Sequence, residues 1–415
     1  MNNDLNILYN SDLSNLEKEN STNKIDLNKN LRNIYIFKFF KSFMITNSVA
    51  SIFYKENGLN STEILTLGSI YSITMVLSEI PSGYISDSIG RRKAIIFSAL
   101  LSFLAYSVFS FSSTFFYFSI VHILLALSTS LSSGSDSALL YDNLQELNKK
   151  QTYKKNESNL LSVESFSEAT ASILGGLIAF YLNKRFNIYS ETFVLFLALI
   201  TSFLIKEVRK NNKIKLSPKE SFYLLKNTFK ENNNLKWFIL YSAIISCSTL
   251  TFASLIQFYL KSISLEIVFF GLVFASLRYS VTIFSMFTDK VESFLGEKYT
   301  LISFPLLAFI AFIAIAIFKS VWAISIFFII YFLRAFNKPI LKNYIQGFVS
   351  NDIRATILSL PSSLCRIIYF PLAPTLGYIT DKYSLSNTFL FAGFFHLFFA
   401  LIPLYFLINE KKKVI

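Results

Sequence analysis

The amino-acid sequence predicts an all-α, polytopic membrane protein with twelve transmembrane helices. Of its 415 residues, 53% are hydrophobic and only 16% are charged, whereas about a quarter of the residues in an average soluble protein are charged. The apolar residues gather in stretches of about 20, the length that a helix needs to cross a hydrocarbon core of about 30 Å. Runs of this length favour helices, because lipid offers the backbone no hydrogen-bond partner and a β-barrel would show short alternating strands.

Twelve apolar stretches follow one another along the chain in two groups of six. A polar central loop, residues 207–236, separates a predicted N-terminal half, 32–206, from a predicted C-terminal half, 237–408. The expected spans are 32–54, 62–86, 93–112, 115–142, 158–182 and 188–206, then 237–260, 265–288, 298–318, 320–347, 354–378 and 386–408.

Lysine and arginine residues concentrate in the loops that follow the even-numbered spans. Cytoplasmic loops retain positive charge, so the polar tail 1–31, the central loop and the basic segment 409–415 are all expected in the cytoplasm. This topology accounts for the net charge of +13 without nucleic-acid binding. We expect a monomer that spans the lipid bilayer of the plasma (inner) membrane.

The sequence contains no pattern that predicts a metal, a cofactor or a disulfide. Cys247 and Cys365 lie inside apolar runs, and the two histidines are equally isolated. None of these residues has the spacing of metal ligands. We therefore expect no metal site and no cofactor.

The stretch GYISDSIGRRK, from Gly83, interrupts the apolar sequence between the second and third spans. Gly83 permits close approach of two helices, and Gly90 permits a reversal of the chain. The cations Arg91, Arg92 and Lys93 favour a cytoplasmic loop and can reach carboxylates on neighbouring helices. The stretch thus predicts a tight, basic cytoplasmic turn.

This turn resembles the loop between the second and third helices of the major facilitator superfamily. The matching residues are Gly83, Asp87, Gly90, Arg91, Arg92 and Lys93. The resemblance covers residues 32–408 and implies a fold of two six-helix halves. In the family the Asp of this motif caps the start of the eleventh helix, and its Arg pairs with an acid at the end of the fourth, which latches the outward-facing state.

In this chain the resemblance assigns those roles to Asp87 and Arg91, with Asp142 as the acid of the fourth span. The alternative is a run of charges that only sets the topology. Two departures from family patterns weigh against drug and proton antiport. The fourth span has no Arg in LALSTSLSSGSDS, and the fifth reads ASILGG where drug exporters often have a Gly-Pro pair.

A partial repeat of the motif, GYITD, occurs at residues 377–381. It falls at the outer end of the eleventh span and lacks the cations, because its loop faces the other side of the membrane. We interpret it as a helix end whose similarity to the motif is a coincidence.

Ionisable residues inside predicted spans are functional candidates, because each costs a few kcal/mol in the bilayer. The first half contains the acids Glu79, Asp136, Glu164 and Glu168, and the second contains Arg278, Arg334 and Arg366. Glu168 and Arg278 are both expected roughly 15 Å deep. In the family the fifth and eighth helices meet across the halves, as do the second and eleventh.

Two ion pairs between the halves are therefore expected, Glu168 with Arg278 and Glu79 with Arg366. The alternative is that these residues pair within their own half, or that a chloride or a water satisfies an arginine. Lys38, like Lys41, is expected to reach the interface with its ammonium group.

Three acids are candidates for carrying a coupling proton. Glu164 and Glu168 are four residues apart on one helix face, and a buried carboxylate beside another has a raised affinity for protons. Asp136 in the fourth span is the third.

The predicted function is secondary transport of a small solute by alternating access, coupled to protons, with export of a lipophilic or cationic compound preferred. Uptake of a nutrient is the first alternative, and a membrane sensor or protein partner with a transporter fold is the second. No Walker-type loop or catalytic constellation occurs, so we do not expect an enzyme.

Overall fold

The computed structural model describes residues 26–208, 233–346 and 354–411, and within these ranges the regular structure is entirely helical. Each predicted apolar stretch is occupied by helix. Nine helical segments in the described part of the chain are long and apolar enough to cross a membrane. The prediction of an all-α, polytopic membrane protein is confirmed.

The N-terminal half contains six spans, of which the first is broken. A helix at residues 26–41 leads to the 3-10 helix η1 (Thr46–Ser48) and to α2 (Ala50–Glu56). Gly134, with a φ of +80°, divides the fourth span into two helices. The remaining elements are α3 (Ser61–Ile89), α4 (Arg91–Phe111), α5 (Phe115–Ser132), α6 (Ser135–Glu146), η2 (Lys150–Thr152), α7 (Tyr153–Tyr181) and α8 (Lys184–Phe203).

The C-terminal half also contains six spans. Its elements are α10 (Asn233–Ser262), α11 (Ile267–Ser285), α12 (Thr288–Ile317), η3 (Val321–Ala323), α13 (Ile324–Gln346), α14 (Arg354–Lys382) and α15 (Leu385–Lys411). Within α12 the backbone leaves the helical conformation at Gly296, whose φ is +71°. This kink lies just before the expected start of the ninth span.

The break in the first span is supported by buried polar side chains. Glu191 of α8 is 2% exposed and accepts a hydrogen bond from the Thr46 N–H at 2.6 Å. Gln257 of α10 accepts one from the Ser51 N–H and donates one to the Asn47 carbonyl, each at 2.8 Å. Backbone groups must be paired inside a bilayer, so these two side chains allow the span to unwind there.

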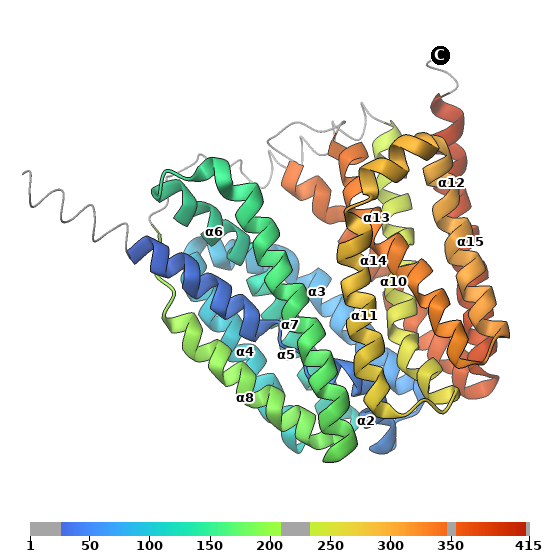
Figure 1. Ribbon diagram of the computed structural model, residues 1–415, viewed down its shortest axis with the longest axis horizontal. Coiled ribbons are helices and arrows are strands. Elements are labelled where there is room, and N and C mark those ends of the chain that lie inside the picture. Colours follow the sequence, from blue (N-terminus) through green and yellow to red (C-terminus); the bar gives the residue numbers. More distant parts are fainter. Residues whose placement is uncertain (1–25, 209–232, 347–353, 412–415) are drawn as a thin grey trace, which may run out of the picture.

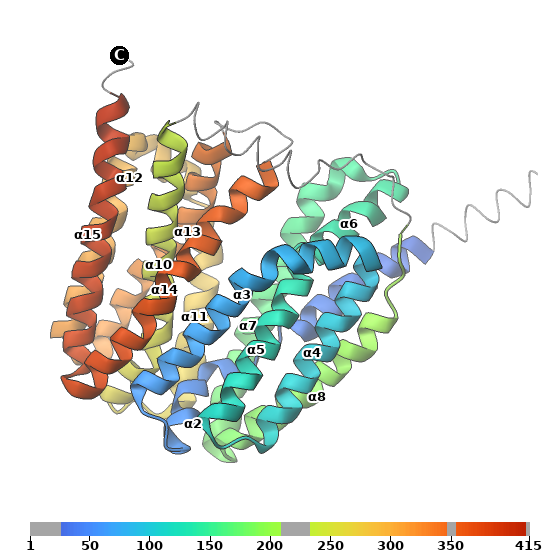
Figure 2. The ribbon, with the colours of Figure 1, turned by 180° about the vertical axis from the view of Figure 1, so that it is seen from behind.

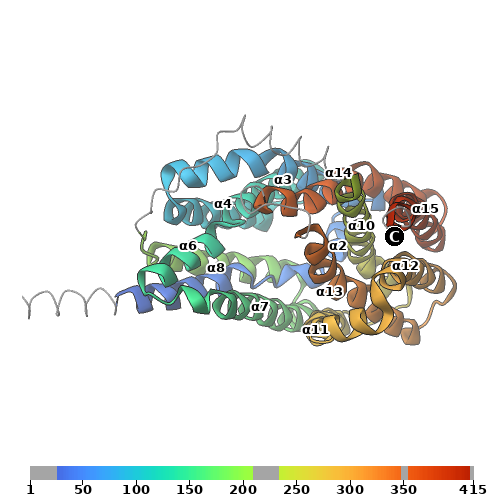
Figure 3. The same ribbon diagram turned by 90° about the horizontal axis from the view of Figure 1, so that it is seen from above.

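The two halves lie side by side, as Figure 1 and the view from behind in Figure 2 show. We call the end of the bundle at which α15 finishes the inner end and the opposite end the outer end, after the sides that the charge pattern predicts. The ribbons of the halves converge at the outer end and diverge toward the inner end. Seen from above in Figure 3, α3 lies beside α14, and α7 lies beside α11.

Large apolar side chains cover the periphery of the bundle. On α8 the exposed side chains include Phe193 and Phe203, and on α15 they include Phe398 and Tyr405, each at least 56% exposed. An aqueous surface rarely presents so many exposed aromatic groups. This surface is the one expected to contact lipid.

Candidate functional site

The halves meet along two pairs of helices, α3 with α14 and α7 with α11. Near the outer end, glycines let the backbones of each pair approach closely. A Cβ atom on Gly377 would lie 2.4 Å from the Cα of Thr62, and one on Gly271 would lie 2.2 Å from the carbonyl oxygen of Ser172. Neither position accepts a larger residue without a shift of the backbone.

Farther toward the inner end, α7 and α11 are joined by an ion pair. Arg278 contacts the carboxylate of Glu168 at 2.8 Å, and the two side chains are only 23% and 16% exposed. The structure therefore brings together the first pair that the sequence predicts between the halves. Removal of either partner would leave an uncompensated, poorly solvated charge.

The second predicted pair, Glu79 with Arg366, does not form in the described structure. Glu79 instead accepts a hydrogen bond from the Ser363 hydroxyl at 2.5 Å. Arg366, one turn farther along α14, lies over the ring of Tyr71 at 5.6 Å from its centroid. The prediction, made by counting residues from the span ends, was wrong by one helical turn in the register of α3 against α14. Hydropathy alone does not determine this register.

At the inner end, the Arg91 guanidinium forms an ion pair with Asp142 of α6 and donates a hydrogen bond to the Ala138 carbonyl at 2.6 Å. The structure therefore brings these two motif residues together. Lys93 is exposed. The side chain of Asp87 and residues 347–353 lie outside the described part of the chain, as does the capping of the eleventh helix that the resemblance implies.

Glu207, which follows α8, belongs to the same turn although the sequence did not single it out. Its carboxylate accepts hydrogen bonds from the backbone N–H groups of Arg91 and Arg92 at 3.2 and 2.9 Å. It thus occupies the anion-binding start of α4. Gly90, with a φ of +99°, presents these groups, and a Cβ there would lie 2.9 Å from the Glu207 carboxylate.

Gly83 makes no close helix contact in this conformation. A Cβ atom at this position would meet no atom within 4 Å. The close approach that its residue type predicts is therefore absent from the described structure. This absence fits the divergence of the halves at the inner end.

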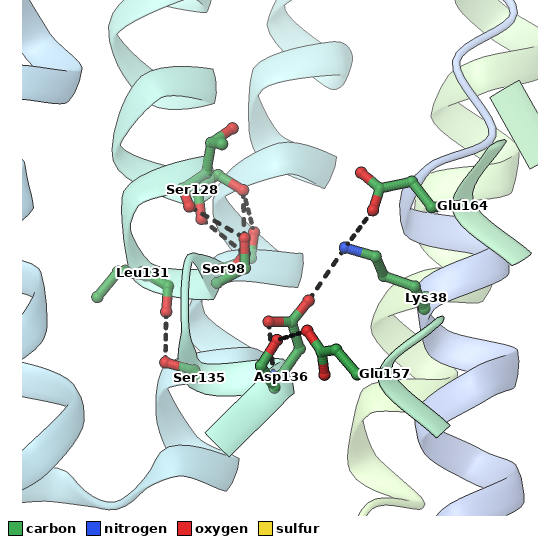
Figure 4. A network of polar contacts seen from close by, with 11 residues as sticks. Lys38, Ser98, Ser128, Leu131, Ser135, Asp136, Glu157 and Glu164 are labelled. Atoms are coloured by element: carbon green, nitrogen blue, oxygen red, sulfur yellow. Dashed lines mark hydrogen bonds and ion pairs between the residues drawn. The ribbon is translucent and has the colours of Figure 1, made fainter. Parts of the chain in front are cut away.

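Lys38 lies between two acids of the N-terminal half, as Figure 4 shows. Its ammonium is 3.0 Å from a carboxylate oxygen of Asp136 on α6 and 3.0 Å from one of Glu164 on α7. The expectation that Lys38 reaches the interface is wrong. The sequence separation of these partners concealed the contact.

Lys41 is likewise turned into the bundle rather than toward the interface. Its ammonium donates to the hydroxyls of Ser102 on α4 and Ser128 on α5, each at 2.6 Å, and to the Ser98 carbonyl at 3.4 Å. Two serines of this cluster are labelled in Figure 4. The serine-rich run in the fourth span was the sequence signal for such a partner.

The GYITD segment lies at the end of α14, as the sequence predicts, and it also makes a contact between the halves. Asp381 accepts hydrogen bonds from the backbone N–H groups of Ser61 and Thr62 at 2.9 and 2.8 Å, and from the Thr62 hydroxyl at 2.8 Å. The end of α14 thus caps the start of α3 at the outer end. We call this contact the outer clasp.

A cavity of about 440 Å³ lies between α10, α13 and α14. It is lined by Ser242, Ser246, Arg334, Asn337, Ser362 and Arg366, among others. The structure therefore places Arg334 and Arg366 on one cavity. Among the described residues, no group of three or more His, Cys, Asp or Glu side chains could hold a metal ion.

Known structures share this arrangement of helices. A nucleoside transporter, NupG, covers 92% of this chain and 98% of its own at a TM-score of 0.75 and 13% identity. A POT family transporter in complex with a thioalcohol-conjugated peptide covers 91% and 96% at 0.70 and 14%. A bacterial homologue of the human lysosomal transporter Spinster covers 92% and 96% at 0.69 and 13%.

At these identities the structural likeness establishes the fold. No curated protein matches the sequence. The sequence itself matches the Major Facilitator Superfamily over residues 34–370, which is most of the chain. With its two six-helix halves and the basic turn that begins at Gly83, the chain belongs to the Major Facilitator Superfamily of membrane transporters.

Proposed function

We propose that this protein is a proton-coupled secondary transporter that moves a small solute by alternating access. The observation that carries this proposal is the ion pair of Glu168 with Arg278, which joins the halves across α7 and α11. A bond made by single side chains can break and re-form as two rigid bodies rock. The outer clasp supports closure of the halves at the outer end. The free space around Gly83 supports their separation at the inner end.

The proposed proton site is the pair of acids that share Lys38. One ammonium cannot balance two carboxylates, so the set of Lys38, Asp136 and Glu164 carries an excess negative charge when both acids are ionised. A proton bound by either acid would remove that excess charge. We assign this role to the acids around Lys38 rather than to Glu168, because Glu168 contacts Arg278 of the opposite half.

The inner turn is proposed to latch the state that is open to the outside. Arg91 already holds Asp142, and closure of the inner end would bring α3 toward α14 at Gly83. We place both termini in the cytoplasm and the protein, as a monomer, in the plasma membrane. Export is the proposed direction on the aromatic-rich spans alone, because Asp136, Glu164 and Glu168 are paired with Lys38 or Arg278 and are not free to attract a cationic solute.

The test is flux in sealed proteoliposomes under an imposed pH gradient. Labelled organic acids, nucleosides, sugars, amino acids and drugs would be supplied in turn, in both orientations of the gradient. The wild-type protein should accumulate at least one of them against its concentration gradient. Glu164→Gln should abolish accumulation but keep exchange of labelled for unlabelled solute, because exchange needs no net proton movement.

A solute that binds the protein without crossing the membrane would contradict transport and favour the sensor alternative. Accumulation by Glu164→Gln at the wild-type level would reject this acid as the proton site. Glu63→Gln, at the half-buried start of α3, is the matched control. It removes a carboxylate outside the bilayer-buried set.

A further inference from the structure

We propose that the cavity between α10, α13 and α14 binds the anionic group of the transported solute, a carboxylate or a phosphate, through Arg334 and Arg366. This inference deepens the proposed transport function and rests on it. It also reverses the expectation of a cationic compound.

Both arginines lack an acidic partner among the described residues. Arg278 is paired with Glu168, whereas neither Arg334 nor Arg366 forms an ion pair with any residue that the structure describes. Arg334 lies 5.9 Å from the centroid of Tyr331, and Arg366 lies over Tyr71. A charged group near the middle of a span is costly unless something compensates it.

The cavity has the size and the polar lining of a ligand site. Its volume of about 440 Å³ falls within the roughly 300–1,000 Å³ that is usual for small-molecule sites. Two guanidinium groups present planar forks of N–H donors, which suit carboxylate and phosphate oxygens. Ser242 and Ser362 line the same space.

One polar atom of the lining indicates a second feature of the solute. Asn337 is 3% exposed, and its amide nitrogen donates to the Ser246 hydroxyl at 2.8 Å. Its amide oxygen has no hydrogen-bond donor among the described residues. A hydroxyl or amino group beside the anionic group would satisfy this oxygen, which would otherwise remain a buried unpaired acceptor.

The site also reaches the opposite half. Tyr71 belongs to α3, whereas Arg366 belongs to α14. An anion that draws Arg366 away from the ring would change a contact between the halves. Binding at this cavity is thereby connected to the movement that transport requires.

The experiment is thermal unfolding of the purified full-length protein with matched small molecules. One series shares a ring: benzoate, phenyl phosphate, benzyl alcohol and benzylamine. A second is aliphatic: citrate, glycerol 3-phosphate and glycerol. The anions should raise the unfolding temperature in a saturable manner, because a ligand that binds only the folded state stabilises it. The alcohols and the amine should not.

Arg334→Gln and Arg366→Gln test the assignment of the site. Each should weaken binding of the stabilising anion roughly tenfold or more, since a charged hydrogen bond contributes about 1.5–3 kcal/mol, and Lys at either position should restore part of it. Both variants should fold, because neither loses an ion-pair partner. Arg32→Gln, on an exposed side chain of the first helix, should bind as the wild type does.

Three results would overturn the proposal. They are stabilisation by benzylamine rather than by the anions, no stabilisation by any anion in either series, and an unchanged anion response in the Arg334→Gln, Arg366→Gln double variant. Equal stabilisation by sodium chloride at the same concentration would show an inorganic anion site and contradict it as well. Flux of a cationic solute would support transport but contradict the anion site. Anion binding without flux would support the anion site but contradict transport.

Discussion

Lys38 determines the electrostatic balance of the N-terminal half, because its ammonium contacts two carboxylates from different helices. Its side chain is 17% exposed, so water compensates little of the charge if the ammonium is removed. The two acids would then face each other without a cation. The consequence should be visible in stability as well as in transport.

Lys38→Gln is expected to destabilise the protein by about 1–3 kcal/mol, since it leaves two partly buried carboxylates without a cation. Unfolding measured by temperature or by denaturant checks the value. Restoration of stability in a Lys38→Gln, Asp136→Asn, Glu164→Gln triple variant would identify the cause as electrostatic. A triple variant as unstable as Lys38→Gln alone would point to lost packing instead.

The pair of Glu168 with Arg278 gives a second prediction at this scale. Glu168→Arg and Arg278→Glu should each abolish transport, because each places like charges opposite one another between α7 and α11. The double variant restores opposite charges at the same positions and should recover a measurable part of the flux. No recovery at all, with both proteins folded, would reject the pair as a working contact.

Which intramembrane residues carry charge could be predicted from the sequence, but not all of their partners could. Residue type, span depth and the helix pairing of the family that the sequence resembles were together enough to bring Glu168 opposite Arg278. They were not enough for Lys38, because a lysine that snorkels and a lysine that holds two acids have the same local sequence. The difference depends on how α6 and α7 pack around the first span.

At the scale of elements, the basic turn between α3 and α4 contains two glycines with different requirements. Gly90 adopts a φ of +99° and faces the Glu207 carboxylate, whereas Gly83 is helical and has free space around it. Substitution of Gly90 therefore tests the stability of the present conformation, whereas substitution of Gly83 tests a conformation in which the inner end is closed.

Gly90→Ala should cost about 1–3 kcal/mol of stability, because a side chain disfavours that backbone conformation and would press on Glu207. Gly83→Ala should leave stability unchanged or raise it by about 0.5–1 kcal/mol, the ordinary helix preference for alanine. It should nevertheless reduce flux if α3 and α14 close together at the inner end. Full flux in Gly83→Ala would argue against that closure.

The outer clasp makes the next prediction. Asp381→Asn should destabilise the closed outer end by about 0.5–1.5 kcal/mol, because one of the two oxygens that accept hydrogen bonds from α3 becomes an NH2 donor. Ser69, which is 1% exposed and donates to the Phe370 carbonyl of α14 at 2.8 Å, reports on this opening when it is replaced by cysteine. The background is a protein whose buried Cys247 and Cys365 are changed to serine.

An impermeant thiol reagent added at the outer side should label Ser69→Cys faster in the Asp381→Asn protein. Glu63→Gln alters the same end of α3 from within its own capping box and is the control. Equal labelling rates in all three proteins would show that Asp381 does not hold the outer end closed.

Hydropathy was sufficient to predict where the helices lie, because each span must supply about 20 apolar residues. The register between helices could not be obtained in this way. Glu79 contacts Ser363 rather than Arg366. A shift of α14 along α3 by one turn changes every side-chain partner but leaves each span equally apolar, so hydropathy does not detect it. The break in the first span was also hidden, since Glu191 and Gln257, which support it, come from α8 and α10.

At the scale of the whole molecule, the contacts between the halves are unevenly distributed. They are closest at the outer clasp and continue at the middle through Glu168 and Arg278, whereas no described residue of the opposite half approaches Gly83 closely. The cavity between α10, α13 and α14 includes Arg366, which contacts Tyr71 of the opposite half. Alternating access requires a second state of the same chain, in which the halves are in contact at the inner end and apart at the outer end.

The most direct test is a pair of distance measurements on spin-labelled protein in liposomes, one at each end of the bundle. Exposed positions allow this: Ser88 with Lys298 at the inner end, and Ser113 with Trp322 at the outer end. When the pH is changed or the stabilising anion is added, we predict that one distance shortens while the other lengthens. Two distances that stay fixed, or that change in the same direction, would contradict alternating access in this protein.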